Sequence, residues 1–202
     1  MSGSLGVVPA GRLATLIGGR DKGALPLVSS TLLTHVIDRL TLQVNGIALN
    51  ANSDGSRFAH LEFPVIADSI DGFAGSLAGV LAGLDWTAEQ GVTRIMTAAA
   101  DTPFFPSDLA TRLDLEDEGM TQPLVIAATP DPIRGTSRPP TFGLWPVSLR
   151  EYLRAALLGG VRKVVQWTDS HDGRLAMFPV DQVDPFFNVK IPEDFAQAKA
   201  MI

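Results

Sequence analysis

Short runs of apolar residues alternate along the chain with stretches in which apolar positions recur every three or four residues. The runs have the length of buried strands, and the recurring positions are typical of helices that bury one face. The predicted strands cover 6–9, 46–50, 64–67, 94–97, 124–128, 141–145, 176–179 and 186–189. The predicted helices cover 32–40, 77–84, 106–113, 147–158, 161–168 and a terminal stretch from 192. This alternation predicts an α/β fold with a mostly parallel sheet.

Glycine, proline and polar capping residues mark the ends of several of these elements. Pro9 and the glycine at 11 stop the first strand, and Ser30 or Thr31 is the predicted N-cap of the helix that follows. A Gly-Gly pair at 159–160 closes the helix that begins at 147. Residues 10–22 are too irregular for a helix. The sequence has no internal repeat, low-complexity tract or linker, so we predict a single domain over 1–202.

The composition narrows the classes of function. The 202 residues include 16 Lys and Arg against 22 Asp and Glu, a formal net charge of −6, which argues against non-specific nucleic-acid binding. The absence of cysteine excludes disulfide scaffolds, zinc ribbons, iron–sulfur clusters and thiol catalysis. No two of the three histidines have the spacing of a metal site. No stretch has the pattern of a signal peptide or membrane span, so we expect a soluble cytoplasmic protein without a membrane partner.

Polar residues follow the predicted strands, where ligands bind in parallel α/β sheets. Asn50 and Asn52 come at the end of the second strand, Asp68 after the third and Asp101 after the fourth. Amide groups suit a base edge or a ribose, and a carboxylate suits a ribose hydroxyl or Mg²⁺. A single Asp at a strand end is also typical of a helix cap or a turn. Polar groups at three consecutive strand ends favour a ligand site at one edge of the sheet.

The segment from Pro9 to Lys22 is the candidate phosphate-binding loop. Its glycines at 11, 18 and 19 allow the backbone to approach an oxyanion closely, and Lys22 supplies a mobile positive charge. The alternative is a solvated glycine-rich turn. The segment matches neither the G-x-x-x-x-G-K-[ST] phosphate loop nor the G-x-G-x-x-G dinucleotide fingerprint.

Several short motifs, in the same order along nearly the whole chain, resemble those of the molybdenum cofactor guanylyltransferases. They are the strand–loop–Lys opening, Asn50-Ala-Asn52, Ala67-Asp68, Gly75-Ser-Leu-Ala-Gly79, Ala100-Asp-Thr-Pro103, Thr141-Phe-Gly-Leu-Trp-Pro-Val and Phe187-Asn-Val-Lys-Ile-Pro-Glu-Asp194. The resemblance implies a Rossmann-like three-layer nucleotidyltransferase fold. It also implies an enzyme that transfers GMP from GTP to the terminal phosphate of molybdopterin and releases pyrophosphate, with Mg²⁺ as cofactor.

The same resemblance implies roles for individual residues. The backbone of Pro9, Ala10 and Gly11 would hold the nucleotide. Lys22 and Asp101 would be the catalytic residues, with Lys22 on the phosphates and Asp101 holding both nucleotide and Mg²⁺. The other candidates are Asn50 and Asp68 for the guanosine, and Asn188 and Lys190 for molybdopterin. The nucleotide would thus bind to the N-terminal part of the domain and molybdopterin to the C-terminal part.

The chain departs from the family pattern on both substrate sides. Arg12 stands where the family has the second glycine of its loop, and Leu16 where it has an arginine. Lys190 stands where the family has the second asparagine of Asn-x-Asn, and Pro139 where it has a histidine. Three alternatives stay open: a molybdopterin cytidylyltransferase, a sugar-phosphate nucleotidyltransferase, and a degenerate member that binds nucleotide or molybdopterin without turnover. Molybdenum-insertion proteins or a molybdoenzyme are further candidate partners.

Overall fold

The computed structural model describes residues 3–10, 14–17, 20–21, 26–27, 30–52, 55–72 and 75–201. The strands are β1 (Leu5–Pro9), β2 (Ala14–Ile17), β3 (Arg20–Asp21), β4 (Pro26–Leu27), β5 (Ser30–Thr31), β6 (Ile47–Asn50), β7 (Val65–Ile66), β8 (Arg94–Thr97), β9 (Val125–Asp131), β10 (Gly135–Ser137), β11 (Gly143–Pro146) and β12 (Arg174–Met177). The α-helices are α1 (Leu32–Thr41), α2 (Ser76–Glu89), α3 (Leu109–Glu116), α4 (Arg150–Leu158), α5 (Val164–Asp169) and α6 (Pro192–Ala200). The 3₁₀ helices are η2 (Gly55–Leu61) and η3 (Val147–Leu149).

Within the described residues, an eight-stranded sheet has the order β10-β9-β11-β8-β1-β6-β7, and β12 pairs with β9. β1 runs parallel to both β6 and β8, and β6 runs parallel to β7. β10 and β11 run against this direction. The link between β9 and β11 holds no helix, and without a crossover the chain returns antiparallel. The mixed, mostly parallel sheet confirms the predicted α/β class.

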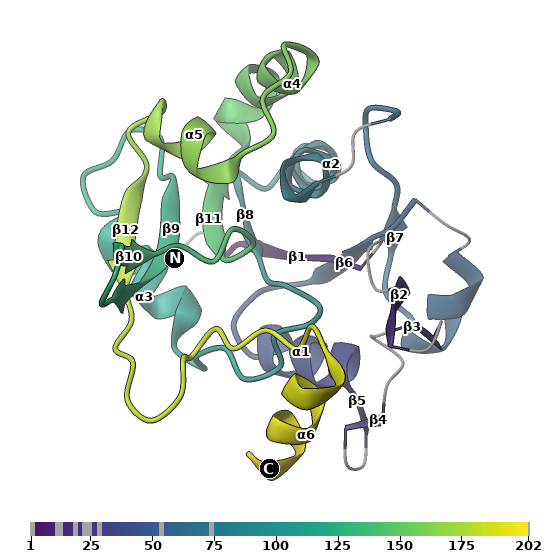
Figure 1. Ribbon diagram of the computed structural model, residues 1–202. Coiled ribbons are helices and arrows are strands. Elements are labelled where there is room, and N and C mark those ends of the chain that lie inside the picture. Colours follow the sequence, from purple (N-terminus) through teal and green to yellow (C-terminus); the bar gives the residue numbers. More distant parts are fainter. Residues whose placement is uncertain are drawn as a thin grey trace.

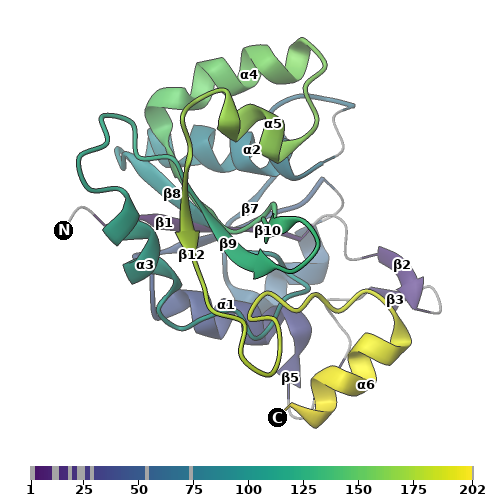
Figure 2. The same ribbon diagram turned by 60° about the vertical axis from the view of Figure 1, so that its left-hand side comes forward.

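Helices cover both faces of the sheet and make the fold three-layered (Figure 1). α2, α4 and α5 lie on one face, above an apolar cluster that contains Trp145 and Trp167. α1 and α3 lie on the opposite face, and Figure 2 shows α6 beyond them, next to β5. No helix in the described ranges is long and apolar enough to cross a bilayer.

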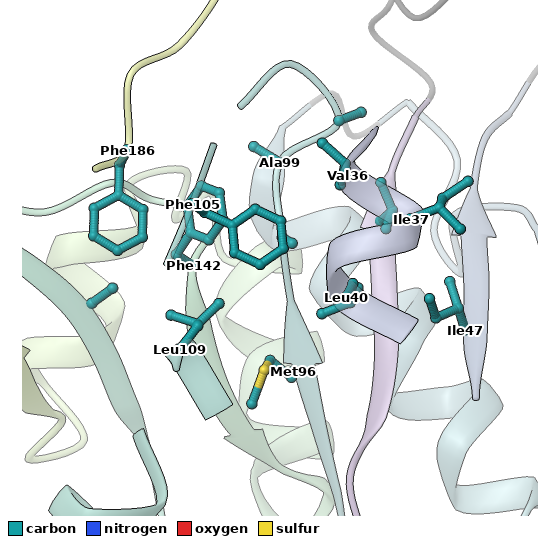
Figure 3. Packing of buried hydrophobic residues seen from close by; sticks show 14 of the residues in the cluster. Val36, Ile37, Leu40, Ile47, Met96, Ala99, Phe105, Leu109, Phe142 and Phe186 are labelled. Atoms are coloured by element: carbon teal, nitrogen blue, oxygen red, sulfur yellow. The ribbon is translucent and has the colours of Figure 1, made fainter. Parts of the chain in front are cut away.

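α1 illustrates how the hydrophobic pattern produces a layer. Its buried positions are Leu32, Leu33, Val36, Ile37 and Leu40, a spacing that puts them along one stripe. Its N-cap is Thr31, whose hydroxyl oxygen accepts a hydrogen bond from the backbone N–H of Thr34 at 3.2 Å. The stripe packs onto the sheet, as Figure 3 shows for the labelled side chains of this helix.

Aromatic rings join the last part of the chain to the core. The ring centroids of Phe105 and Phe142 are 5.4 Å apart, and those of Phe142 and Phe186 are 4.8 Å apart (Figure 3). Phe178 meets Phe186 edge to face at 5.2 Å. Full burial of one such ring stabilises the fold by about 1.5–3 kcal/mol, so these contacts hold the segment after β12 against the sheet.

Some boundaries differ from the predictions. The prediction of a strand over 186–189 was wrong, because the N–H of Phe186 donates to the Asp184 carboxylate at 2.8 Å and that of Val189 to a loop carbonyl. α3 begins at Leu109 instead of 106, after a turn closed by the bond from its N–H to the Pro106 carbonyl. The β2–β3 hairpin within 10–22 and the short β10 were not predicted.

One buried hydrogen bond in the core gives a stability prediction. The indole Nε1–H of Trp145 donates to Thr97 Oγ1 at 2.8 Å, and both residues are fully buried. Thr97→Val keeps the shape of the side chain but leaves the indole N–H without an acceptor. We expect the free energy of unfolding to fall by about 1–3 kcal/mol in urea denaturation.

Thr87 provides the matched control for that substitution. It is also fully buried, but its hydroxyl has no hydrogen-bond partner among the described residues. Thr87→Val therefore removes an uncompensated polar group, and we expect it to be neutral or stabilising. Equal losses of stability in the two variants would show that the Trp145–Thr97 bond is not what matters.

Candidate active site

A cavity of about 850 Å³ opens at the carboxyl ends of β1, β6 and β8. Parallel pairing puts these ends level, since Pro9 is opposite Asn50 in the β1–β6 register. The lining comes from the strand ends, the start of α2, the β9–β11 region and the segment after β12: Pro9, Asn50, Asn52, Asp68, Gly75, Ser76, Ala99–Thr102, Thr129, Arg134, Ser137–Phe142, Asp184, Phe186–Asn188 and Lys190. Positions as far apart in the sequence as Pro9 and Lys190 thus meet in one cavity at the strand ends, where ligands bind in parallel α/β sheets.

Most of the predicted site residues whose side chains the structure describes line this cavity. They are Pro9, Asn50, Asp68, Asp101, Asn188 and Lys190. Ala10 is fully buried behind them, and its N–H donates to the Asn50 carbonyl at 2.8 Å. The predicted residues Gly11 and Lys22, with Arg12, lie outside the described residues.

An amide–carboxylate network occupies the β6 end of the cavity. Asn50 Nδ2 donates to Asp68 Oδ1 at 2.9 Å, and Asn52 Nδ2 donates to Asp68 Oδ2 at 2.7 Å. Asn52 Oδ1 in turn accepts the backbone N–H of Asp68 at 2.7 Å. Each carboxylate oxygen of Asp68 therefore has one amide donor and keeps acceptor capacity for a ligand. Asn52 was noticed at a strand end in the sequence, but its two bonds to Asp68 depend on the β6–β7 pairing.

Asp101 lies in the middle of the lining, in a turn directly after β8. The turn is closed by a 3.3 Å hydrogen bond from the Thr102 N–H to the Ala99 carbonyl. The buried residues Ala98–Ala100 anchor it, and the Ala98 N–H donates to the Val7 carbonyl of β1 at 3.2 Å. The Asp101 carbonyl accepts the N–H of Val189 at 2.8 Å. The half-buried Asp101 therefore has a well-defined position between the two ends of the cavity.

The carboxylate of Asp101 suits a magnesium ion that is shared with a nucleotide. In the described part of the chain, no group of three or more His, Cys, Asp or Glu could hold a metal by itself. Mg²⁺ commonly takes one or two carboxylates and completes its coordination with phosphate oxygens and water. A single carboxylate beside the cavity fits this mode of binding and does not fit a closed structural metal site.

The opposite end of the cavity carries cations. Arg134, Arg138 and Lys190 line it. Arg138 Nη1 donates to Asp169 Oδ1 of α5 at 2.5 Å, which orients the guanidinium. Arg134 is carried by the β9–β10 turn, where Asp131 Oδ1 accepts the N–H groups of Ile133 and Arg134, both at 2.8 Å. These two hydrogen bonds lower the pKa of Asp131.

Two arginines near the site were not predicted. The turn signature Asp131-Pro-Ile-Arg-Gly135, with Gly135 at φ 77°, was a local signal for the hairpin that carries Arg134. Arg57 of η2 donates from Nη2 to the Ala10 carbonyl at 3.3 Å and stacks on the Phe58 ring, with 4.4 Å from Cζ to the centroid. This contact braces the chain where it leaves β1, and no sequence pattern indicated it.

Asn188 contributes an unusual acceptor to the cation end. Its Oδ1 is shielded from solvent and has no hydrogen-bond partner among the described residues. A buried acceptor without a partner costs about 1–3 kcal/mol, which a donor on a bound ligand would offset.

The chain matches the MobA-like NTP transferase domain over residues 6–177. Among curated proteins, it is 44% identical over 198 residues to the molybdenum cofactor guanylyltransferase of Rhodopseudomonas palustris. That alignment covers 96% of this chain and 90% of the relative.

Solved structures share the fold at low identity. The molybdopterin-guanine dinucleotide biosynthesis protein A of Archaeoglobus fulgidus superposes with a TM-score of 0.71 at 22% identity, covering 98% of this chain and 97% of that chain. The 4-diphosphocytidyl-2C-methyl-D-erythritol synthase of Anaerococcus prevotii gives 0.74 at 12% identity, with 99% and 96% covered. These two neighbours have names that specify different nucleotides, so the shared fold does not by itself select the base.

Proposed function

The chain belongs to the family of MobA-like NTP transferases, and we propose that it transfers GMP from GTP to the terminal phosphate of molybdopterin, with Mg²⁺ as cofactor. Nucleotidyl transfer in molybdenum cofactor biosynthesis follows from this membership. The observation that supports the finer assignment is the arrangement of the cavity. Asn50 and Asp68 lie at one end, Asp101 lies between, and Asn188 and Lys190 lie at the other.

Each end of the cavity has chemistry for one substrate. Both N–H groups of the Asn50 side chain are already bonded, to Asp68 and to the Ile66 carbonyl. The amide oxygen of Asn50 and the carboxylate of Asp68 therefore offer acceptors to the N–H groups of guanine and to the ribose hydroxyls. The backbone of Pro9, Ala10 and Gly11 and the ammonium of Lys22 would hold the phosphates. The cations at the other end suit the phosphate of molybdopterin. Asn188 Oδ1, which has no partner within the described part of the chain, suits an N–H donor of the pterin.

The reaction is a displacement at phosphorus. An oxygen of the molybdopterin phosphate forms a bond to the α-phosphorus of GTP, while the bond from that phosphorus to the α–β bridging oxygen breaks and pyrophosphate leaves. The nucleophile is already an anion, so no general base is required. The residues of the chain position the two substrates and stabilise charge. Lys22 stabilises the negative charge that develops on the phosphates, and Asp101 would hold the magnesium ion. Mg²⁺ bound at Asp101 would neutralise phosphate charge.

Isothermal titration calorimetry with Mg·GTP and Mg·CTP, followed by a turnover assay with molybdopterin, tests the proposal. We expect GTP to bind more tightly than CTP, and the added molybdopterin to yield molybdopterin guanine dinucleotide and pyrophosphate. Preferred binding of CTP would favour the cytidylyltransferase. Binding without turnover would favour the degenerate, nucleotide-binding member, and turnover only with a sugar phosphate would favour the third alternative.

Arg12 is expected to replace the cation that the loop lacks at Leu16. A guanidinium in this loop can bind phosphate oxygens, whereas leucine cannot. We therefore expect Arg12→Ala to weaken GTP binding about tenfold in the same titration, which corresponds to about 1.4 kcal/mol. Arg20, in the same segment, is the alternative source of that charge, so Arg20→Ala is titrated beside it. Unchanged binding by the Arg12 variant would reject the compensating role of Arg12.

A further inference from the structure

Residues 184–191, here called the strap, lie in the segment that connects β12 to α6. Asp184, Phe186, Phe187, Asn188 and Lys190 of the strap line the cavity. Val189 lies between two of these residues but is fully buried elsewhere, in a cluster with Leu27, Leu32 and Ala198. The strap therefore directs Asn188 and Lys190 to the cavity while Val189 anchors it on the other side, the alternation expected of extended chain.

A backbone hydrogen bond joins the strap to the turn that carries Asp101. The Val189 N–H donates to the Asp101 carbonyl at 2.8 Å. This backbone bond fixes the height of the strap above the turn that carries Asp101. It does not fix the direction in which the chain continues, because a single bond leaves the next peptide free to rotate.

The second attachment comes from Asp194 in the first turn of α6. Its Oδ2 accepts the N–H of Lys190 at 2.8 Å and the N–H of Ile191 at 3.0 Å. Ile191 occupies the N-cap position and has no side-chain acceptor, so the Asp194 carboxylate provides the capping there. A carboxylate that receives two N–H groups at a helix N-terminus makes strong hydrogen bonds.

We propose that Asp194 is a positioning residue for the second substrate: through its bonds to the strap it holds Lys190 and Asn188 at the cavity. Asp194 is not part of the cavity lining, so its effect on the reaction passes through the strap. This inference rests on the proposed function, since it takes Asn188 and Lys190 to bind molybdopterin. Its consequence is selective: loss of the carboxylate disturbs the molybdopterin end and spares the nucleotide end.

The test compares Asp194→Ala, Asp194→Asn and Glu193→Ala in the full-length protein. Glu193 is exposed in the same helical turn, so its substitution removes the same charge from the helix N-terminus without removing the acceptor. Asparagine at 194 keeps an oxygen that accepts both N–H groups. The readouts are KM for molybdopterin and for GTP, GTP affinity by calorimetry, Tm, and amide hydrogen exchange at Lys190 and Ile191.

We expect Asp194→Ala to raise KM for molybdopterin about tenfold, as the loss of about 1.4 kcal/mol would, with KM and affinity for GTP within about twofold of wild type. Exchange at the two amides accelerates. Asp194→Asn and Glu193→Ala stay near wild type.

Equal changes in both KM values, no change in either, or an Asn variant as impaired as the Ala variant would overturn the positioning role. If Asp194→Ala does not fold, Asp194→Asn and Glu193→Ala decide. The positioning role is then overturned unless Asp194→Asn retains the wild-type KM for molybdopterin. A wild-type protein that transfers no GMP overturns the proposed function itself, which is visible before any variant is compared.

Discussion

Asp101→Asn is expected to lower kcat by about 100- to 1,000-fold, the scale of a lost electrostatic contact to a transition state. The substitution keeps the size of the side chain and removes the negative charge that would hold Mg²⁺ between the two substrates. The backbone bond between the Asp101 carbonyl and the Val189 N–H is independent of that charge. We therefore expect Tm to change by no more than about 3 °C, equivalent to roughly 1 kcal/mol in a protein of this size.

Measuring GTP binding with Mg²⁺ and with EDTA distinguishes a role of Asp101 in metal binding from a general disruption of the site. In wild type, Mg²⁺ is expected to strengthen GTP binding, and the Asp101 variant is expected to bind GTP equally with Mg²⁺ or with EDTA. Asp108→Asn is the control: Asp108 follows in the same loop, pairs at the surface with Arg112 at 2.6 Å, and does not line the cavity. Full turnover by the Asp101 variant would remove that residue from the mechanism.

The part of the site that could be predicted is the part that local patterning determines. Asn50, Asp68 and Asp101 follow short apolar runs, and parallel strands bring their carboxyl ends to one edge. Their convergence on one cavity therefore follows from the hydrophobic pattern and the rule for ligand sites in such sheets. The direct hydrogen bond between Asn50 and Asp68 was beyond that reasoning, because side-chain pairing depends on the register of β6 and β7.

The cavity end that Asn188 and Lys190 line is formed by contacts between segments that are far apart in the sequence. The strap resembles a strand in sequence because Phe186 and Val189 are apolar, yet its N–H groups go to Asp184 and Asp101. Neither partner can be inferred from periodicity. The resemblance to a known family is what assigned Asn188 and Lys190 to the second substrate, and the strap explains only how both side chains come to line the cavity.

Gly79→Ala is expected to weaken GTP binding about tenfold with little change in stability. A Cβ at Gly79 of α2 would lie 2.7 Å from Asn50 Oδ1 and 3.4 Å from the Pro9 Cβ. Asn50 is also bonded to Asp68 and to the Ile66 carbonyl, so moving it disturbs the nucleotide end as a unit. The gain in helix propensity, up to about 1 kcal/mol, offsets part of the strain.

Gly83→Ala, one turn further along α2, is the matched comparison and has the opposite expected result. A Cβ there would lie 2.7 Å from Val7 Cγ2 and 3.0 Å from Ile95 Cδ1, both fully buried in central strands. Overpacking of this kind costs about 1–3 kcal/mol and helix propensity returns up to about 1 kcal/mol, so Tm falls by up to about 6 °C. GTP affinity stays near wild type, because no side chain of the cavity is displaced.

Calorimetry measures the affinity of both variants for GTP, and thermal unfolding measures their stability. A Gly79→Ala variant that loses stability but not affinity would show that Asn50 does not hold the nucleotide.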